Sequence, residues 1–528
     1  MRKVLTCSLM ALALLAAACG SQRAPSALNS DSNNSGAPST PSTAVTPSTS
    51  ATNDTSAPNN STTAPTSTPA ADPFGWHQLG SDKNVEQGSL QVPIDYNDPS
   101  KGKFTLHIVR HKASNPKLRI GSLLVNPGGP GFGGSILAEQ ATAIYGQDLL
   151  DRFDIVAWDP RGTGKSTPAI DCITDYDHFF NSSDITPDTP AAKQQIVDLA
   201  KQFTDACISK NSKILDFVGT NNSARDMDSI RQALGEAKIS YFGFSYGSEL
   251  GATWATLFPS TVRAAVLDGA ADPGADEVES GLQQSKGFEK SLDTFLQQCS
   301  TDSKCPFNNE GNAAAAFDTL MQGIDDSPIP TEEGRPPLTR GAALTGVAEA
   351  MYSDASWPQL ADALASAQSG NGAGLLALYD EYYQRQPDGS YDNSLEAFNV
   401  ISCMDSPDRL TVAEDDANAP KFNAVAPRLS PGTTGSYQCD FFPPSPDPRV
   451  KITGKGAGPI LVMGTTGDPA TPLDSTRNMA KALEQGVLVV VTADQHTGYG
   501  VNRCSLNTVD DYLVDPAKNV PPNNKQCK

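Results

Sequence analysis

The chain has 528 residues, a net charge of −21 at pH 7 and a pI near 4.6. This length exceeds one ordinary compact core, so we expect two packed units with tails. The acidic balance argues against nucleic acid or an anionic membrane surface as a partner, because both need clustered Lys and Arg. It is compatible with cationic ligands such as the free α-amine of a peptide, although the simpler interpretation is that it supplies solubility.

The first residues have the pattern of an export signal, in which a positive start precedes an apolar stretch that ends at Ala18. This stretch is too short for a membrane-spanning helix of about 20 residues. The small residues before Cys19 resemble a bacterial lipoprotein box, although Ala16 stands where that box usually has Leu, Val or Ile. We predict a signal peptide over 1–18 and lipidation of Cys19, which would anchor the protein on the outer face of the cell membrane. Ordinary signal cleavage before Cys19, giving a secreted protein, is the alternative.

The residues after the signal are almost entirely Ser, Thr, Pro, Ala and Asn. Such a segment cannot bury enough apolar surface to offset the entropy lost on ordering. We therefore predict a disordered tether over 19–71. No other segment has the length and apolarity of a membrane span, so membrane contact is expected only through the lipid.

Ten cysteines are present, and eight remain once Cys7 in the signal and Cys19 are set aside. An even number in an exported chain predicts disulfides, although sequence alone leaves the connectivity open. No pair has Cys-x-x-Cys spacing, so zinc and redox roles are not expected. Pairing of neighbours is the simplest arrangement: Cys172–Cys207, Cys299–Cys305, Cys403–Cys439 and Cys504–Cys527.

From Trp76 onward, apolar runs alternate with helical patterns, which predicts a largely parallel sheet. In the helix expected at 223–234, Ser223 or Asn222 could supply the N-cap. The expected strands are 89–94 and 104–110, an antiparallel pair, then 120–126, 153–158, 239–244, 262–268, 459–463 and 487–492. The further helices expected beside them are 245–258 and 475–484.

The residues from 271 to 455 differ, because they are mostly helical or irregular and broken by Pro and Gly. A sheet that is interrupted by a helical block and then completed describes a core with an inserted cap. We expect core segments at 72–270 and 456–528 with the cap at 271–455. We find no internal repeat.

Gly243-Phe244-Ser245-Tyr246-Gly247 lies between an expected strand and an expected helix. Gly-x-Ser-x-Gly in this context is the nucleophile elbow of the α/β-hydrolase fold. The serine occupies a strained turn, and the glycines let the strand and the helix approach without Cβ clashes. We therefore expect Ser245 to be a catalytic nucleophile, at the positive end of a helix.

A serine hydroxyl needs a base, and in this fold the order along the chain is Ser, acid, His. His496 follows the last expected strand, and the other four histidines all precede Ser245. Asp468 comes directly after the preceding strand, where its carboxylate could accept from the imidazole. We predict a triad of Ser245, Asp468 and His496. The other acids weighed for this role, with less support, are Asp474, Asp494 and Asp268.

A glycine-rich run over 126–134 follows the third expected strand, where this fold places one oxyanion donor. We choose the N–H of Gly129, with Gly128 as the alternative, and the N–H of Tyr246 as the second donor. The later run Asp159 to Ser166 lacks the spacing of a phosphate-binding loop, so we interpret Asp159 and Arg161 as structural.

Together these motifs resemble the proline-iminopeptidase-like serine peptidases, most closely their secreted tripeptidyl aminopeptidase branch with its mycobacterial-type exported lipoprotein proteases. The resemblance covers nearly all of 76–527. It implies the α/β-hydrolase fold, with a mostly parallel sheet, helices on both faces and a largely helical cap. It also implies hydrolysis of peptides or proteins near a free N-terminus. The matching stretches are 92–96, 126–131, 159–166, 243–247 and 468–472.

The chain departs from that branch at four positions that bear on substrate preference rather than on chemistry. Leu79 and Gln87 stand where many members have a cysteine pair, Glu249 where an aromatic residue is frequent and Gln495 where glycine is common. The candidates for binding a substrate amine are Glu249 and a cluster that a solvated face explains more simply: Asp276, Glu277 and Glu279.

The sequence therefore predicts a serine peptidase that works through an acyl-enzyme and requires no metal or organic cofactor. The rival hypotheses are a carboxylesterase or lipase with the same triad and a surface binding lipoprotein that has lost catalysis. The preferred side chains and the oligomeric state are not predicted.

Overall fold

The apolar runs of the sequence pair into one sheet of ten strands within the part of the chain that the structure describes. The structure is a computed structural model that describes residues 72–181, 186–187, 189–430 and 437–528. The predicted signal peptide, Cys19 and the whole of the predicted tether lie outside these residues. The strands are β1 (His77–Gln78), β2 (Val85–Pro93), β3 (Lys103–His111), β4 (Gly121–Asn126), β5 (Phe153–Trp158), β6 (Ile239–Phe244), β7 (Val262–Asp268), β8 (Ile460–Thr465), β9 (Gly486–Val491) and β10 (Lys525–Cys527).

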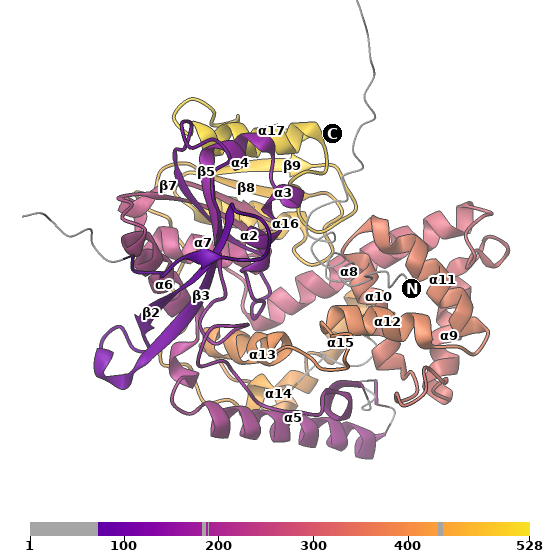
Figure 1. Ribbon diagram of the computed structural model, residues 1–528. Coiled ribbons are helices and arrows are strands. Elements are labelled where there is room, and N and C mark those ends of the chain that lie inside the picture. The colour runs from indigo at the N-terminus through magenta and orange to yellow at the C-terminus, as the bar shows by residue number, and fades with distance from the viewer. Residues whose placement is uncertain (1–71, 182–185, 188, 431–436) are drawn as a thin grey trace, which may run out of the picture. The chain divides into compact units, whose positions relative to one another are not determined.

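The strand order is β1-β2-β3-β5-β4-β6-β7-β8-β9-β10. The first four strands in this order pair antiparallel, and all pairings from β5 to β10 are parallel. Parallel neighbours need crossover connections, which explains why helices cover both faces (Figure 1). One face carries α2 (Ile136–Glu139), α3 (Ala141–Ile144), α4 (Gln147–Arg152) and α17 (Arg503–Val514), and the other carries α6 (Thr220–Ala233), α7 (Tyr246–Leu257) and α16 (Leu473–Ala482). This arrangement confirms the predicted α/β-hydrolase fold.

The central strands are buried along their whole length, because helices cover both of their faces. Successive side chains enter opposite cores, as Leu123 and Leu124 do in β4. Continuous apolar runs of this kind can be recognised in the sequence, and β5, β6 and β7 have the predicted bounds.

The predicted cap of α6 is wrong. The helix begins at Thr220, whose N–H donates to the distant carboxylate of Asp405 at 2.7 Å.

The segment between β7 and β8 is helical, and it belongs to the same compact unit as the sheet. Its first helices pack around their own apolar cluster, which includes Leu292, Leu344 and Leu375. α13 instead buries Val400 and Ile401 in the core beside the sheet. The helices are α8 (Glu277–Thr301), α9 (Ala313–Asp326), α10 (Arg340–Met351), α11 (Trp357–Gln368), α12 (Ala373–Tyr382), α13 (Ser394–Asp405), α14 (Val412–Asp416) and α15 (Ala419–Val425).

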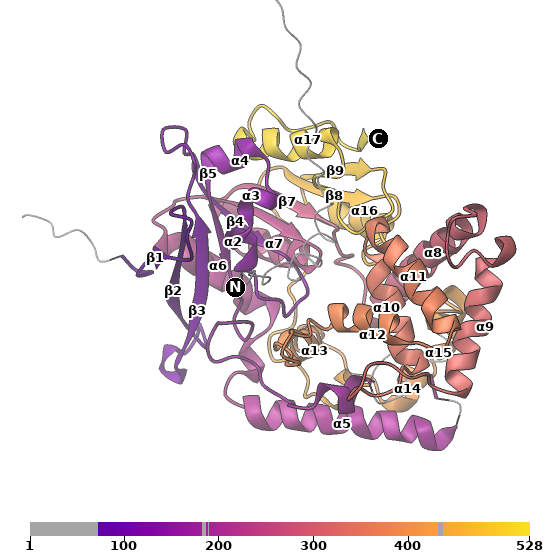
Figure 2. The ribbon, with the colours of Figure 1, turned by 45° about the vertical axis from the view of Figure 1, so that its right-hand side comes forward.

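A long helix from the expected core segment, α5 (Pro190–Asn211), lies along the inserted helices rather than on the sheet (Figures 1 and 2). Lys193 at its start pairs with Asp416 of α14 at 2.5 Å. Thr204 donates to the carbonyl of Gln438 at 3.0 Å. The connection between β5 and α6 therefore extends the inserted segment, a feature that the sequence analysis did not anticipate.

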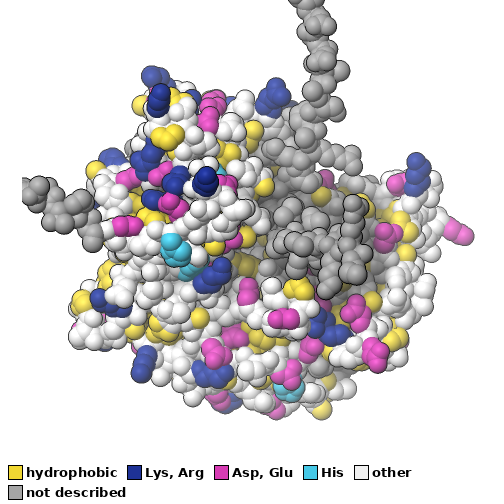
Figure 3. All heavy atoms as spheres, in the orientation of Figure 1, with side chains coloured by type: hydrophobic (Ala, Val, Ile, Leu, Met, Phe, Trp, Pro, Cys, Tyr) yellow, Lys and Arg dark blue, Asp and Glu magenta, His cyan; other side chains and the backbone are white. Residues whose placement is uncertain are grey.

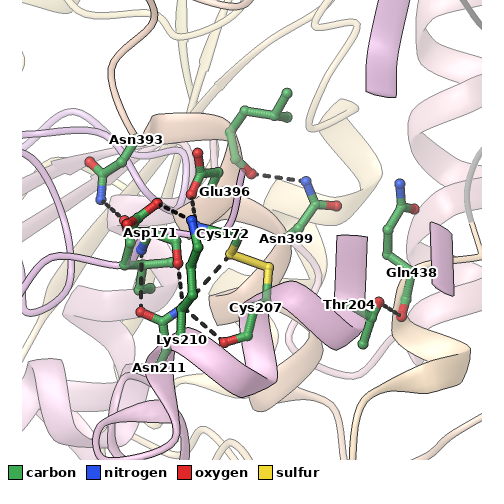
Figure 4. Close-up of a disulfide and its surroundings, with 12 residues drawn as sticks. Asp171, Cys172, Thr204, Cys207, Lys210, Asn211, Asn393, Glu396, Asn399 and Gln438 are labelled. Atoms are coloured by element: carbon green, nitrogen blue, oxygen red, sulfur yellow. Dashed lines mark hydrogen bonds and ion pairs between the residues drawn. A yellow bond between two sulfur atoms is a disulfide. The ribbon is translucent and has the colours of Figure 1, made fainter. Parts of the chain in front are cut away.

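Four disulfides join each described cysteine to its neighbour along the chain, as the simplest pairing from sequence supposes. Figure 4 shows one of them, which ties α5 to the segment after β5. The Cys172 N–H donates to Glu396 of α13, and Asn211 donates to the carbonyl of Asp171 at 2.9 Å. The pairs are Cys172–Cys207, Cys299–Cys305, Cys403–Cys439 and Cys504–Cys527.

Acidic and basic side chains are interspersed on the face drawn in Figure 3, with scattered hydrophobic side chains among them. In the described ranges, none of the helices has both the length and the apolarity needed to cross a bilayer.

Arg161 and Asp226 form an ion pair with no exposure to solvent. The guanidinium donates to both carboxylate oxygens, at 2.8 and 2.5 Å, and to the carbonyl of Ile94 at 3.0 Å. Tyr96 also donates to this carboxylate at 2.7 Å. The pair joins the loop after β5 to α6, and the bond to Ile94 adds the residue that follows β2, which supports the structural interpretation of Arg161.

Asp226→Asn should destabilise the fold by about 3–5 kcal/mol, because it leaves the Arg161 charge buried without its counter-ion. Denaturant unfolding measures this loss. Asp515→Asn, which breaks the exposed pair with Lys518, is the control and should leave stability nearly unchanged, because solvent screens exposed pairs. Equal effects of the two substitutions would contradict the assignment.

Candidate active site

Ser245 lies in a sharp turn between β6 and α7, with a backbone φ of +54°. This backbone conformation is unfavourable for a non-glycine residue, so the surrounding structure must hold Ser245 in it. A Cβ at Gly243 would come within 2.3 Å of the Gly247 carbonyl oxygen, and one at Gly247 within 2.9 Å of the Asn126 carbonyl oxygen. The two glycines of the motif therefore permit the close approach of strand, turn and helix that the sequence predicted.

The turn is held from the neighbouring strand, because the Ser245 N–H donates to the carbonyl of Asp268 at 2.8 Å. Tyr246 is the first residue of α7, so its own N–H has no acceptor within that helix. No other acceptor of this N–H is found among the described residues, so the site above the turn combines a serine hydroxyl with a free N–H at the positive end of a helix.

His496 and Asp468 lie side by side, both buried, on the loops that follow β9 and β8. The Nδ1 of His496 lies 2.8 Å from Oδ1 and 3.0 Å from Oδ2 of Asp468. Because an ionised carboxylate only accepts, Nδ1 carries the proton and Nε2 is left with its lone pair. Nε2 is buried without a hydrogen-bond partner among the described residues, which leaves it available to a hydroxyl group.

The Asp468 carboxylate is itself fixed by the turn that begins α16. It accepts the N–H of Ala470 at 3.0 Å and the N–H of Thr471 at 2.8 Å. The Thr471 hydroxyl donates to Oδ2 at 3.1 Å and lies 3.3 Å from Nδ1 of His496. Thr471 lies within the matching stretch 468–472 but was assigned no role from the sequence, so its contact to the imidazole is a finding of the structure.

Two opposing effects set the pKa of His496. Burial lowers it by disfavouring the charged ring, but the negative charge of Asp468 and the hydrogen bond to it raise it, and the pKa is raised overall. The neighbouring Gly269 has a φ of +67°, and a Cβ there would come within 2.9 Å of the imidazole Cε1. This glycine, which the sequence analysis did not single out, makes room for the ring.

The glycine-rich loop after β4 lies directly against the elbow. A Cβ at Gly128 would come within 2.8 Å of the Ser245 Cβ. The Gly128 N–H is already engaged, because it donates to Oδ1 of Asn126 at 3.0 Å. The Gly129 N–H has no acceptor within the described ranges, so the geometry favours Gly129 over Gly128 as an oxyanion donor.

Asp159 supports this loop from β5. Its carboxylate accepts the N–H of Ser135 at 2.9 Å and the N–H of Lys165 at 2.9 Å. Gly131 packs against the inserted segment, since a Cβ there would come within 2.4 Å of the Ser394 carbonyl oxygen. The loop is thus held between the sheet and α13.

Asp268, which was considered from the sequence as an alternative acid, forms no hydrogen bond with the imidazole among the described residues and binds backbone groups instead. Its carboxylate accepts the N–H groups of Gly498 and Tyr499, both at 2.8 Å, and so holds the loop that carries His496. Burial raises the pKa of Asp268 to about 7, against the lowering effect of these two bonds. Through its carbonyl it also accepts the Ser245 N–H, so one residue contacts both the Ser245 turn and the His496 loop.

The inserted segment reaches the imidazole directly. The His496 N–H donates to the carbonyl of Tyr352 at 2.8 Å, and the two rings meet edge to face with centroids 5.6 Å apart. Ser353 and Gln495 form an isolated antiparallel bridge. No local motif marks Tyr352, so sequence reasoning had no signal for it.

The remaining predicted side chains lie elsewhere. Asp474 is exposed and pairs with Arg477, and among the described residues no hydrogen bond or ion pair joins Asp494 to His496. Of the amine candidates, Glu249 is buried in an ion pair with Arg449, and Asp276 caps α8 by accepting the N–H of Glu279. Both carboxylates therefore form structural contacts within the protein.

Comparison with known proteins agrees with this geometry. A family model described as the alpha/beta hydrolase fold matches residues 121–499. The chain is an α/β hydrolase. It is 35% identical over 461 residues to serine protease Hip1 of Mycobacterium tuberculosis, covering 83% of this chain and 86% of that protein. Carboxylesterase B of M. tuberculosis is 33% identical over 450 residues, with 83% and 85% covered.

Tripeptidyl aminopeptidase of Streptomyces lividans is 27% identical over 463 residues, covering 83% of this chain and 84% of that protein. The resemblance stated from the motifs is confirmed by these relatives. The α/β hydrolase is therefore a serine hydrolase of the branch that contains Hip1 and the tripeptidyl aminopeptidases.

Because His496 accepts a proton only when neutral, kcat/KM of this hydrolase should rise with pH, with a midpoint above the ordinary pKa of histidine. Asp468→Asn removes the charge that raises this pKa, so the midpoint should move to lower pH. The substitution also removes the carboxylate that keeps the proton on Nδ1 of His496, so kcat should fall by about 10⁴-fold. Asp494→Asn is the matched control and should leave the profile unchanged. A midpoint that is the same in Asp468→Asn and wild type would contradict the pairing.

Proposed function

We propose that this protein is an exported serine peptidase that hydrolyses peptides near a free N-terminus. The observation that carries the proposal is the Asp468–His496 pair, which leaves Nε2 of the imidazole unengaged at the same sheet edge as the Ser245 turn. The kinship with a serine protease and a tripeptidyl aminopeptidase supports a peptide substrate. On this proposal the triad is Ser245, Asp468 and His496.

In the first half-reaction, Nε2 of His496 takes the hydroxyl proton as Ser245 Oγ forms a bond to the scissile carbonyl carbon. The carbonyl oxygen becomes an oxyanion that accepts from the N–H groups of Gly129 and Tyr246. The C–N bond then breaks as His496 returns its proton to the leaving amine. Water, deprotonated by His496, attacks the acyl-enzyme and regenerates Ser245.

A buried carboxylate in the inserted segment supports recognition of a free amine. Glu349, on α10 one turn before Tyr352, is only 7% exposed, and no hydrogen bond or ion pair of its side chain is found in the described ranges. Burial, with the nearby charge of Glu381, raises the pKa of Glu349 to about 8. A carboxyl group in this state gains most from a cationic partner, such as a peptide α-ammonium.

We also propose that the chain is exported and held at the outer face of the cell membrane through lipid on Cys19. This part rests on the sequence of the first 19 residues, which are followed by the Ser/Thr/Pro-rich tether. Mass spectrometry of the membrane-extracted protein would detect a lipidated N-terminal cysteine.

Unblocked and N-acylated tripeptide amides with a chromogenic leaving group should separate the candidate activities. The unblocked peptide should be cleaved, the acylated peptide should not, and Ser245→Ala should lose both the cleavage and labelling by a fluorophosphonate probe. Cleavage of a short acyl ester alone would favour an esterase, in line with the relationship to carboxylesterase B. Absence of labelling in the wild type would exclude both serine-hydrolase hypotheses and favour the non-catalytic binding protein.

Glu349→Gln should lower kcat/KM for the unblocked peptide by about 10- to 100-fold, because a charged hydrogen bond to the ammonium is lost. Hydrolysis of an acyl ester, which carries no amine, should change little. Glu289→Gln is the matched control, since Glu289 is equally buried in the inserted segment but accepts from the Arg428 and Leu429 N–H groups. An unchanged preference for the free amine in Glu349→Gln would exclude this carboxylate as the amine site.

A further inference from the structure

The side chain of Tyr246 leads away from the catalytic turn to a buried carboxylate of the inserted segment. Its hydroxyl forms a hydrogen bond with the Thr220 hydroxyl at the start of α6. The Thr220 Oγ1 donates to Oδ2 of Asp405 at 2.5 Å, and its N–H donates to Oδ1 at 2.7 Å. Asp405 is the last residue of α13. Three elements that are distant in sequence therefore meet through one chain of polar groups.

The direction of the hydrogen bonds in this chain is fixed by the carboxylate. A hydroxyl has one proton, and Thr220 gives its own to Asp405, so the Tyr246 hydroxyl must donate to Thr220. Every link is then satisfied, and removal of either hydroxyl would leave a buried polar group without its partner.

Asp405 is held at some energetic cost. It is 5% exposed, and in the described ranges it forms no ion pair with a lysine or arginine. Burial raises its pKa to about 7, although the two bonds from Thr220 oppose this change. A buried carboxyl group without a cation is expensive for stability alone, so a role beyond packing is the natural expectation.

A second contact joins the same two parts of the molecule one helical turn further along α7. Glu249 pairs there with Arg449, whose N–H donates to the Asp405 carbonyl at 3.1 Å. The first turn of the nucleophile helix is thus attached twice to the inserted segment, at Tyr246 and at Glu249.

We propose that Thr220 and Asp405 are positioning residues that aim the Tyr246 N–H at the oxyanion from the inserted segment. The inference rests on the proposed function, in which this N–H is an oxyanion donor. As the first residue of α7, Tyr246 has no intrahelical bond to fix its N–H. Its anchored side chain supplies that restraint, and an oxyanion donor displaced by even a fraction of an ångström loses much of its effect.

The test compares Tyr246→Phe, Thr220→Val and the double variant in the full-length protein. Each single change removes one hydroxyl, keeps the side-chain shape and leaves the Tyr246 N–H in place. We expect kcat to fall by about 10- to 100-fold with KM nearly unchanged, for peptide and ester substrates alike, because both form an oxyanion. The double variant should lose no more than either single variant, since both cut the same chain.

Thr220→Ser restores the hydroxyl and should recover most of kcat. Thr253→Val is the matched control: Thr253 is fully buried on α7, its hydroxyl has no partner among the described residues, and kcat should stay at the wild-type value. Asp405→Asn should behave like Thr220→Val, and thermal unfolding will show which variants are folded.

Wild-type kcat in Tyr246→Phe and Thr220→Val would overturn the proposal, as would a rise in KM at constant kcat or full additivity in the double variant. Labelling of Ser245 by a fluorophosphonate probe separates this failure from failure of the proposed function. If wild type is labelled and Ser245→Ala is not, the triad stands and only the positioning role falls. If wild type is not labelled, the proposed function itself fails.

Discussion

The left-handed backbone at Ser245 is the constraint on which the rest of the site depends. A φ of +54° at a residue with a side chain is unfavourable, so the surroundings must hold it. They do so through glycines at Gly243 and Gly247, which admit the closest approach, and through the carbonyl of Asp268, which binds the Ser245 N–H. The parallel sheet then brings the loops after β8 and β9 to the same edge, because the strands all end there.

The inserted segment is a structural part of the site rather than a cover laid over it. It binds the His496 loop through the Tyr352 carbonyl, and it binds the first turn of α7 through Asp405 and Arg449. From the sheet, Asp268 holds the His496 loop and the Ser245 turn, and Asp159 holds the glycine-rich loop after β4. The residues proposed as the base and the oxyanion donors are therefore fixed by both the sheet and the inserted segment, which is the arrangement that preorganised catalysis requires.

The sequence predicted the parts of this structure whose causes are local. Buried parallel strands are continuous apolar runs, so β5, β6 and β7 could be bounded to the residue, and Asp468 and His496 follow strands as this fold requires. Tyr352 and Asp405 could not be found in this way. Their roles depend on which distant segment packs beside the elbow, and neither lies in a motif. The start of α6 was misplaced for the same reason, because its cap is a carboxylate 185 residues away.

The disulfide pattern has a consequence for how the chain reaches this structure. Eight cysteines could pair in 105 ways. Here they form four pairs of consecutive cysteines, with separations of 35, 6, 36 and 23 residues. A chain that meets an oxidant from its N-terminus onward would close each bond before a competing thiol emerges. Maturation then needs no disulfide exchange, and the oxidising machinery has only to supply electron acceptors, not to correct errors.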